Sequence, residues 1–185
     1  RNIGIGDSAL DANTTASNNT AVGVSALTSN TTGPSNTAMG YLAMTTNTTG
    51  ADNSGFGQST LRYNTTGTNN AAVGNNALLS NTSGGENTAV GRNALDANTT
   101  GNYNTAVGYH ALTNHTTGTY NSAVGKHALY NVTTGHNNSG IGYGAGDNIT
   151  TGAYCTMLGR STNASRVDAQ YQIAIGYGVP CTADN

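Results

Sequence analysis

The residues that could carry out acid–base or hydrolytic chemistry are few in this chain and are not grouped. The carboxylates are scattered along the sequence: Asp7, Asp11, Asp52, Glu86, Asp96, Asp147, Asp168 and Asp184. No nucleophile elbow, HExxH sequence or phosphate-binding loop is present, and matches such as Gly4-Ile5-Gly6 belong to a glycine pattern that recurs along the whole chain. The sequence therefore predicts a protein that is not an enzyme and that needs no cofactor.

Two histidines, His110 and His127, lie 17 residues apart. If this interval is one turn of a repetitive fold, the two rings stack about one strand spacing apart, and a symmetric assembly could turn them into a metal site. Other residue types, such as Leu42 and Asn76, occur at the same interval, which favours exposed histidines in a variable column. His110 and His127 are therefore weak metal candidates, and no metal is predicted.

Tyrosines recur at multiples of the same interval. One set is Tyr103, Tyr120, Tyr154 and Tyr171, and a second is Tyr41, Tyr109, Tyr143 and Tyr177. Aligned aromatic rings beside Asn and Thr form an amphipathic surface on which sugars stack, so the first set is a candidate glycan contact. The alternative is that Tyr, which favours β structure, packs along a ladder of strands.

Threonines form two columns, one running from Thr14 to Thr150 and the other from Thr15 to Thr151 with one Ser. Flat Thr arrays suit ice binding, but neighbours in a strand face opposite ways, so adjacent columns argue against a single array. The same segments hold N-x-T/S sequons, such as Asn30-Thr31-Thr32 and Asn148-Ile149-Thr150. Dense glycosylation would follow in a eukaryotic secretory path, although Asn as a turn former or stacked amide explains the pattern equally.

All these intervals come from a 17-residue repeat that runs through the chain in eleven copies without insertion or deletion. With Asn19-Thr20-Ala21-Val22-Gly23 as positions one to five, the consensus is N-T-A-V-G-x-x-A-L-x-x-N-T-T-G-x-x. Position five is always Gly: Gly6, Gly23, Gly40, Gly57, Gly74, Gly91, Gly108, Gly125, Gly142, Gly159 and Gly176. We expect each of these glycines to have a positive φ or to lie where coils approach too closely for a Cβ atom.

Units this short and this rich in turn residues cannot be helical hairpins, and they fit single coils of a parallel β-solenoid. We expect two short strands and two turns per coil, with Asn98 and Gly101 supplying positive φ in the N-T-T-G turn. Coils that stack at the strand spacing would make a rod roughly 50 Å long.

Each expected strand carries a small and a large apolar residue side by side. We expect the large ones, such as Val107 and Leu112, to fill the interior, and the small ones, such as Ala106 and Ala111, to lie outside. Columns of outward Ala and Gly would form a smooth apolar wall that another copy of the chain could cover. The alternative is that Ala is merely tolerated on the surface.

Composition narrows the class of protein further. Charged residues are 8% of the chain, against about a quarter in ordinary globular proteins, and the net charge is −2. No basic run suggests nucleic acid as a partner, and no apolar stretch is long enough to cross a membrane. The chain begins and ends inside a repeat, so we interpret it as a segment of something longer, and Cys155 and Cys181 do not reveal whether they are bonded.

The motifs N-T-A-V-G and N-T-T-G resemble those of two related groups. Asn104-Thr105-Ala106-Val107-Gly108 is similar to the head repeat of trimeric autotransporter adhesins. The whole chain also resembles the repeat shaft of phage and viral tail-fibre proteins that carry a C-terminal intramolecular chaperone. The stretch from Arg160 to Gly178 looks like the segment that precedes such a chaperone. The resemblance implies a β-roll, left-handed in the adhesins, assembled as a homotrimer on a virion or cell surface.

We therefore expect an extracellular fibre shaft, from a tail fibre or an adhesin stalk, that presents a host- or surface-binding element. Residues 1–165 would form the shaft, and residues 166–185, where N-T-T-G is lost, would lead into a further domain. The alternative function is a β-solenoid that binds glycan or ice through its Tyr or Thr columns. A host glycan or receptor is the expected external partner.

Overall fold

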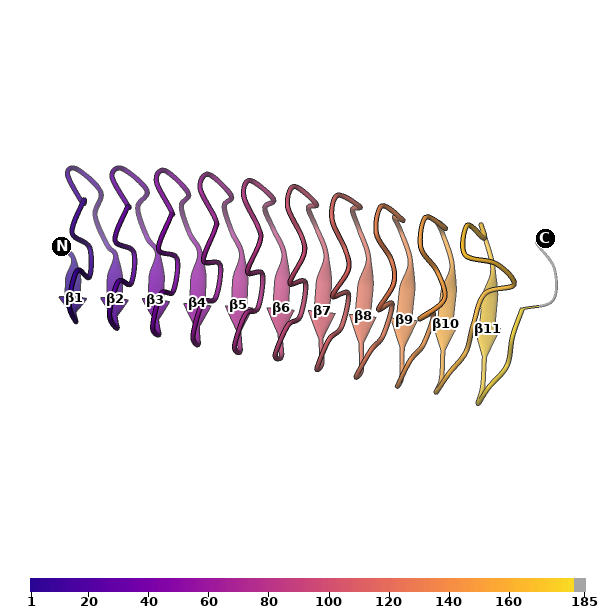
Figure 1. The fold of residues 1–185 in the computed structure, drawn as a ribbon. Coiled ribbons are helices and arrows are strands. Elements are labelled where there is room, and N and C mark those ends of the chain that lie inside the picture. The colour runs from indigo at the N-terminus through magenta and orange to yellow at the C-terminus, as the bar shows by residue number, and fades with distance from the viewer. Residues whose placement is uncertain (182–185) are drawn as a thin grey trace.

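The computed structural model describes residues 1–181 as a rod of stacked coils (Figure 1). All its regular structure is β, in one parallel sheet whose strands follow chain order from β1 to β11. The strands are β1 Ile3–Ile5, β2 Thr20–Val22, β3 Thr37–Met39, β4 Ser54–Phe56, β5 Ala71–Val73, β6 Thr88–Val90, β7 Thr105–Val107, β8 Ser122–Val124, β9 Ser139–Ile141, β10 Thr156–Leu158 and β11 Ile173–Ile175. The predicted β-solenoid of eleven 17-residue coils is confirmed.

Strand pairing keeps the repeat in strict register. In β7 and β8, Thr105 pairs with Ser122, Ala106 with Ala123 and Val107 with Val124. Hydrogen bonds between coils continue into the turns, where the His127 amide donates to the Tyr109 carbonyl at 3.0 Å. Each repeat position therefore forms a straight column along the rod.

The expectation of two strands per coil was wrong, because the structure has one three-residue strand per repeat. The second expected strand would contain positions eight and nine. Position nine instead has a left-handed backbone, with φ of 50° at both Leu112 and Leu129. This conformation turns the chain and points the Leu side chain inward, so no extended segment can form there.

The interior is built from small residues on the strand side and larger ones opposite. Ala106, Ala111 and Leu112 are fully buried, which confirms the prediction for Leu112. The predictions for Val107, which is 36% exposed, and for Ala106 and Ala111 were wrong. The space facing Leu is small. Position three is Ala or Gly in every coil from Gly4 to Gly140, and the first large residue there, Met157, lies beside Gly146, which replaces Leu.

Buried asparagines at positions one and twelve complete the interior as two amide ladders. At position one, Asn53 Nδ2 donates to the Gly67 carbonyl at 2.8 Å, and Asn53 Oδ1 accepts from the Asn70 amide at 3.0 Å. At position twelve, Asn47 Nδ2 donates to Asn30 Oδ1 at 2.8 Å. These bonds satisfy polar groups whose burial would otherwise be costly.

At position five, the backbone conformation and the neighbouring coil leave no room for a side chain. Gly108 has φ of 141°, and a Cβ atom there would lie 2.5 Å from the Gly125 carbonyl oxygen of the next coil. Both reasons predicted for these glycines are thus confirmed.

The N-T-T-G element is built differently from the predicted turn. Asn98 is buried and is absent from the residues with positive φ, and Gly101 also lacks a positive φ. Gly101 is required instead by close approach, because a Cβ atom would lie 2.5 Å from Asn98 Oδ1. The left-handed residues are at positions seven, nine and seventeen, for example His110, Leu112 and Tyr120.

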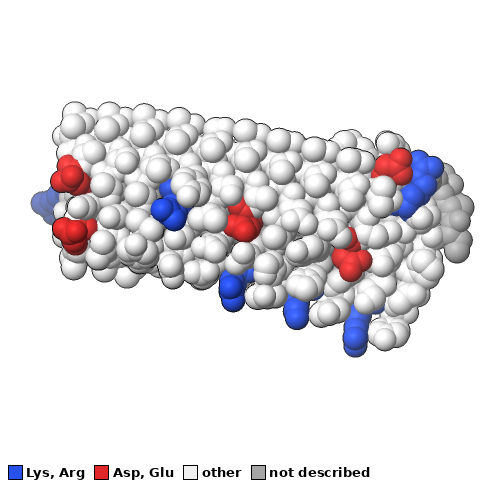
Figure 2. Space-filling model, in the orientation of Figure 1, with Lys and Arg blue, Asp and Glu red and all other residues white. Residues whose placement is uncertain are grey.

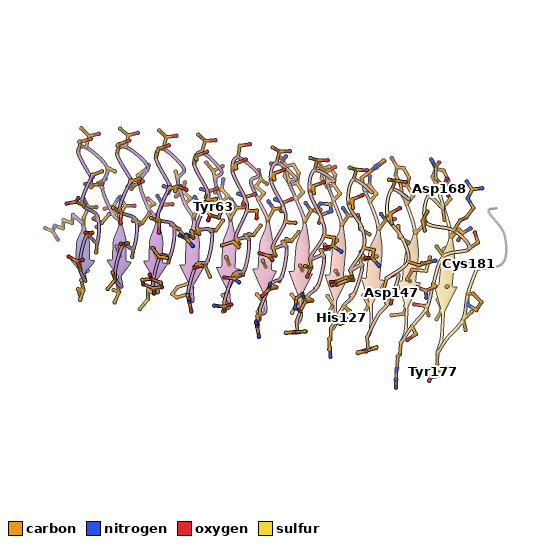
Figure 3. All side chains as sticks on the ribbon, viewed as in Figure 1. Tyr63, His127, Asp147, Asp168, Tyr177 and Cys181 are labelled. Atoms are coloured by element: carbon orange, nitrogen blue, oxygen red, sulfur yellow. The ribbon has the colours of Figure 1, made fainter. Side chains whose placement is uncertain are left out.

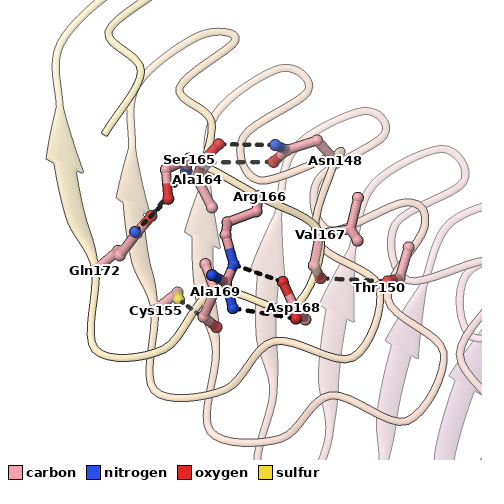
Figure 4. Close-up of polar contacts among 10 residues, drawn as sticks. All are labelled: Asn148, Thr150, Cys155, Ala164, Ser165, Arg166, Val167, Asp168, Ala169 and Gln172. Atoms are coloured by element: carbon pink, nitrogen blue, oxygen red, sulfur yellow. Dashed lines mark hydrogen bonds and ion pairs between the residues drawn. The ribbon is translucent and has the colours of Figure 1, made fainter. Parts of the chain in front are cut away.

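The last coils keep their stacking although N-T-T-G is lost (Figure 4). Thr150 Oγ1 donates to the Val167 carbonyl at 3.2 Å, as the preceding threonines of this column do to one another. Gln172 replaces the usual Asn, and its amide group bonds both the Ser165 amide and the Ser165 hydroxyl. The solenoid therefore continues across residue 166 to β11, and the predicted further domain beyond it stays a prediction.

Candidate functional site

The outer surface of the rod is a set of parallel columns, and these are its candidate functional features. Within the described residues there is no group of three or more His, Cys, Asp or Glu side chains that could hold a metal ion. Residues 1–181 contain no helix of the length and apolarity needed to cross a bilayer. What the surface offers is repetition of one side-chain type at the coil spacing.

Position four forms an apolar stripe along the whole rod. We call this the position-four stripe: Ile5, Val22, Met39, Phe56, Val73, Val90, Val107, Val124, Ile141, Leu158 and Ile175. Most of these side chains are 36–63% exposed, so they sit on the strand face with one side in solvent. The apolar wall predicted from outward Ala therefore exists, but Val and Ile build it, because Ala106 and Ala111 are buried.

His110 and His127 are brought together as their spacing predicts. Their ring centroids are 5.7 Å apart, and the rings meet edge to face. His110 Nδ1 lies 3.1 Å from Thr113 Oγ1. Partial burial, and then the positive charges of His127 and Arg92, lower the pKa of His110, which favours the neutral form of that ring.

The four tyrosines predicted as a glycan contact form two separate pairs. Tyr103 and Tyr120 stack with centroids 4.8 Å apart, and Tyr154 and Tyr171 stack at 4.9 Å. Asn137 occupies the position between the pairs. Each ring thus has one face covered by its neighbour, and the charge of Glu86 raises the pKa of the Tyr103 phenol.

A more regular feature lies at position six and was missed by the sequence interpretation. From Arg92 onward, this column alternates cationic and aromatic residues: Arg92, Tyr109, Lys126, Tyr143, Arg160 and Tyr177. We call it the cation–tyrosine ladder. The alternation is visible in the sequence at the 17-residue interval. Figure 3 places Tyr177 at the lower end of the last coil and His127 at the same edge of the rod, three coils earlier.

The Thr columns differ in what their hydroxyls do. Position-thirteen side chains bond the backbone of the next coil, as when Thr99 Oγ1 donates to the Thr116 carbonyl at 3.1 Å. Position-fourteen side chains, such as Thr100 and Thr117, are exposed. A flat surface of two free Thr rows is therefore absent from the described residues, and the Thr columns do not support ice binding.

The sequon asparagines at position twelve are not exposed. Asn30, Asn47 and Asn64 have no accessible surface, and the amide nitrogen of each donates to the carbonyl of the glycine three residues later. Glycosylation at these sites does not fit the folded coil.

The carboxylates occupy unrelated places and form no acid–base pair in the described part of the chain. Burial raises the pKa of Asp96, whose Oδ2 accepts from Asn93 Nδ2 at 3.1 Å. A hydrogen bond from Arg166 lowers the pKa of Asp168, and the two form an exposed ion pair at 2.8 Å. Asp184 lies outside the described residues.

Comparison with family models, with curated proteins and with solved structures finds no match to this chain. Functional assignment therefore depends on the columns themselves.

Proposed function

We propose that the chain is the shaft of an extracellular fibre, in which three copies lie side by side in register. The observation that carries this proposal is the position-four stripe, which is apolar in every coil, whereas the other exposed columns mix apolar and polar residues. A stripe of this kind runs the length of the rod and marks a protein contact rather than a catalytic site.

The partner that fits this stripe best is another copy of the same chain. Only a surface with the same coil spacing can match an apolar residue to each coil over about 50 Å. Burying the exposed part of each Val or Ile contributes roughly 0.5–1 kcal/mol per coil, and the repeat multiplies this gain along the rod. Three copies is the number implied by the resemblance to adhesin heads and tail-fibre shafts, and a stripe one residue wide suits copies that converge on an axis.

The mechanical role follows from the way each coil is held. Backbone bonds such as Thr105 N to Asn121 O at 2.8 Å run parallel to the rod axis and recur in every coil. Bending the rod requires stretching these bonds together with the two Asn ladders. A stiff rod of this kind would space a binding tip from a particle or cell.

Native mass spectrometry or analytical ultracentrifugation tests the assembly. The measured mass should correspond to three copies of the chain. The triple variant Val90→Asp, Val107→Asp, Val124→Asp should dissociate into single chains while keeping the circular dichroism spectrum of β structure. The matched control is Thr100→Asp, Thr117→Asp, Thr134→Asp, which adds the same charge at exposed positions away from the stripe. A wild-type chain that is a stable monomer at micromolar concentration would refute the proposal.

A further inference from the structure

In the cation–tyrosine ladder, Lys126 and Arg160 each lie close to the tyrosine rings of the neighbouring coils. Lys126 Nζ lies 5.5 Å from the Tyr109 ring centroid and 5.7 Å from that of Tyr143. Arg160 lies 5.4 Å from the Tyr143 centroid and 5.5 Å from that of Tyr177. Each of these two cations is thus placed between two rings.

This arrangement decides which atoms face solvent. Lys126 and Arg160 come from the coils before and after Tyr143, so they cover both faces of its ring. The tyrosine rings of the ladder remain 42–74% exposed, which leaves their edges and hydroxyl groups outward. The outward surface is therefore a row of hydrogen-bond donors in which charged and phenolic groups alternate.

The ladder also has a regular charge spacing. The Gly144 amide donates to the Lys126 carbonyl at 3.0 Å, and the Ser161 amide donates to the Tyr143 carbonyl at 2.8 Å, so the backbone is locked to one coil per step. Cations recur every second coil, which places them about 9.6 Å apart.

Positive charge is concentrated at this column. The chain has six Lys and Arg residues, and the ladder holds three of them. The one carboxylate at position six is Asp7, in the first coil, which is outside the ladder. Asp96 and Asp147 are at position ten of their coils. Figure 2 shows Lys and Arg side chains projecting along the lower edge of the C-terminal half, with acidic groups above them on the same face.

From this geometry we infer that the cation–tyrosine ladder binds a linear acidic polysaccharide, with an acidic group on about every second sugar. The carboxylates or sulfates would meet Arg92, Lys126 and Arg160, and the sugar hydroxyls between them would meet the phenol groups of Tyr109 and Tyr143. The inference adds a binding surface to the proposed shaft and does not require three copies.

Single-stranded nucleic acid fits this column less well. Its recognition relies on bases that stack on free aromatic faces and on a charge at every nucleotide. In the ladder, cations cover the faces of Tyr143 and charge recurs only at every second coil. An anionic lipid surface would need cations spread over an area rather than along one line.

Equilibrium binding of the assembled protein to hyaluronan and to chondroitin, whose carboxylates recur on every second sugar, tests the inference, with unsulfated dextran as the neutral comparison. The variant Arg92→Gln, Lys126→Gln, Arg160→Gln should weaken binding to the acidic polymers about tenfold or more, and it should flatten a salt dependence whose log–log slope is about −2 for three contacts. Unsulfated dextran should bind neither protein.

The matched control is Arg1→Gln, Arg62→Gln, Arg166→Gln, which removes the same charge from the other three cationic positions. It should change affinity by less than about twofold. Equal losses in the two variants would mean that net charge alone is responsible and would overturn the inference. Tighter binding to a single-stranded oligonucleotide or to phosphatidylserine vesicles, or no binding to either acidic polymer, would overturn it as well.

Discussion

His115 interrupts the buried amide ladder at position twelve, where the preceding coils have asparagine. Its ring is fully buried, and its Nε2 lies 2.9 Å from the Gly118 carbonyl oxygen. The His115 Nδ1 and Asn98 Oδ1 atoms have no hydrogen-bond partner. Burial lowers the pKa of His115, opposed in part by the bond to Gly118, so the folded chain holds a neutral imidazole.

The first prediction concerns pH. The unfolded chain binds a proton at His115 near the ordinary pKa of 6.5, while the folded chain resists protonation, so stability falls as pH is lowered through about 6.5. His115→Asn should remove this part of the pH dependence. It should also raise stability at pH 7 by about 1 kcal/mol, because an Asn amide can donate to Asn98 Oδ1.

Thermal unfolding at pH 7 and pH 5 measures both effects. His136→Asn, which makes the same replacement at a half-buried histidine outside the core, is the control, and it should keep the loss of stability at pH 5 that comes from His115. His110 contributes in the same direction and is present in both variants. An unchanged difference between the two pH values in His115→Asn would contradict the account of this residue.

The second prediction concerns Gly108. Gly108→Ala should cost well over about 1 kcal/mol, because the φ of 141° and the Gly125 carbonyl both oppose a side chain. Gly85→Ala is the control, since position sixteen holds Ala, Thr, Asn and His in other coils and has no positive φ. Urea unfolding compares them, and equal costs would show that the conformation of Gly108 is not what requires glycine.

Some side-chain positions could be predicted from the sequence and others could not. The role of Gly108 could be predicted because position five is Gly in every repeat. Only a positive φ or a lack of room for a Cβ atom requires glycine so strictly. The exchange of Ala106 and Val107 could not, because it depends on how little room Leu leaves inside the coil. The amide ladder at position twelve was foreseen as one of two alternatives, since Asn serves both in turns and in buried stacks.

At the scale of the element, one coil is the unit of structure and each coil bonds only its two neighbours. The period of 17 residues predicted the number of coils and the parallel register, because constant unit length leaves no other stacking. The number of strands per coil could not be predicted, because the left-handed conformation of Leu112 is unusual for a residue with a large side chain.

The third prediction follows from this independence of coils. Deleting residues 87–103 removes one whole unit and joins Glu86 to Asn104, which restores every column. The protein should fold, assemble and shorten by about 4.8 Å. Small-angle scattering and circular dichroism measure the length and the fold.

Deleting residues 87–102 is the matched control. It leaves one extra residue in the joined coil, so the strand that follows is displaced by one position and its inward and outward faces exchange. This shorter deletion should destabilise the rod more than the longer one. The reverse order would show that coils are not interchangeable units.

At the scale of the whole molecule, one long rod carries two different surface columns, which lie two positions apart in each repeat. The position-four stripe is apolar from end to end, whereas the cation–tyrosine ladder occupies only the C-terminal half. Assembly of copies along the position-four stripe would leave the cation–tyrosine ladder exposed beside the contact. The sequence interpretation foresaw an apolar wall and aligned tyrosines, but it assigned the wall to Ala and considered a different tyrosine column for binding.

The last prediction separates the two tyrosine columns. Tyr103, Tyr120, Tyr154 and Tyr171 stack on one another in pairs, so replacing all four with Ala should cost about 1–3 kcal/mol of stability through the two lost stacks. It should leave surface attachment and acidic-polysaccharide binding unchanged, because these rings stabilise the turn of the coil.

In the ladder, Tyr109→Leu with Tyr143→Leu should weaken polysaccharide binding, since Lys126 then loses both rings that position it. Binding and attachment assays on folded, assembled protein compare the two variants. Loss of attachment in the fourfold variant with the ladder intact would make the stacked pairs the receptor site and would overturn the assignment of this column to stability alone.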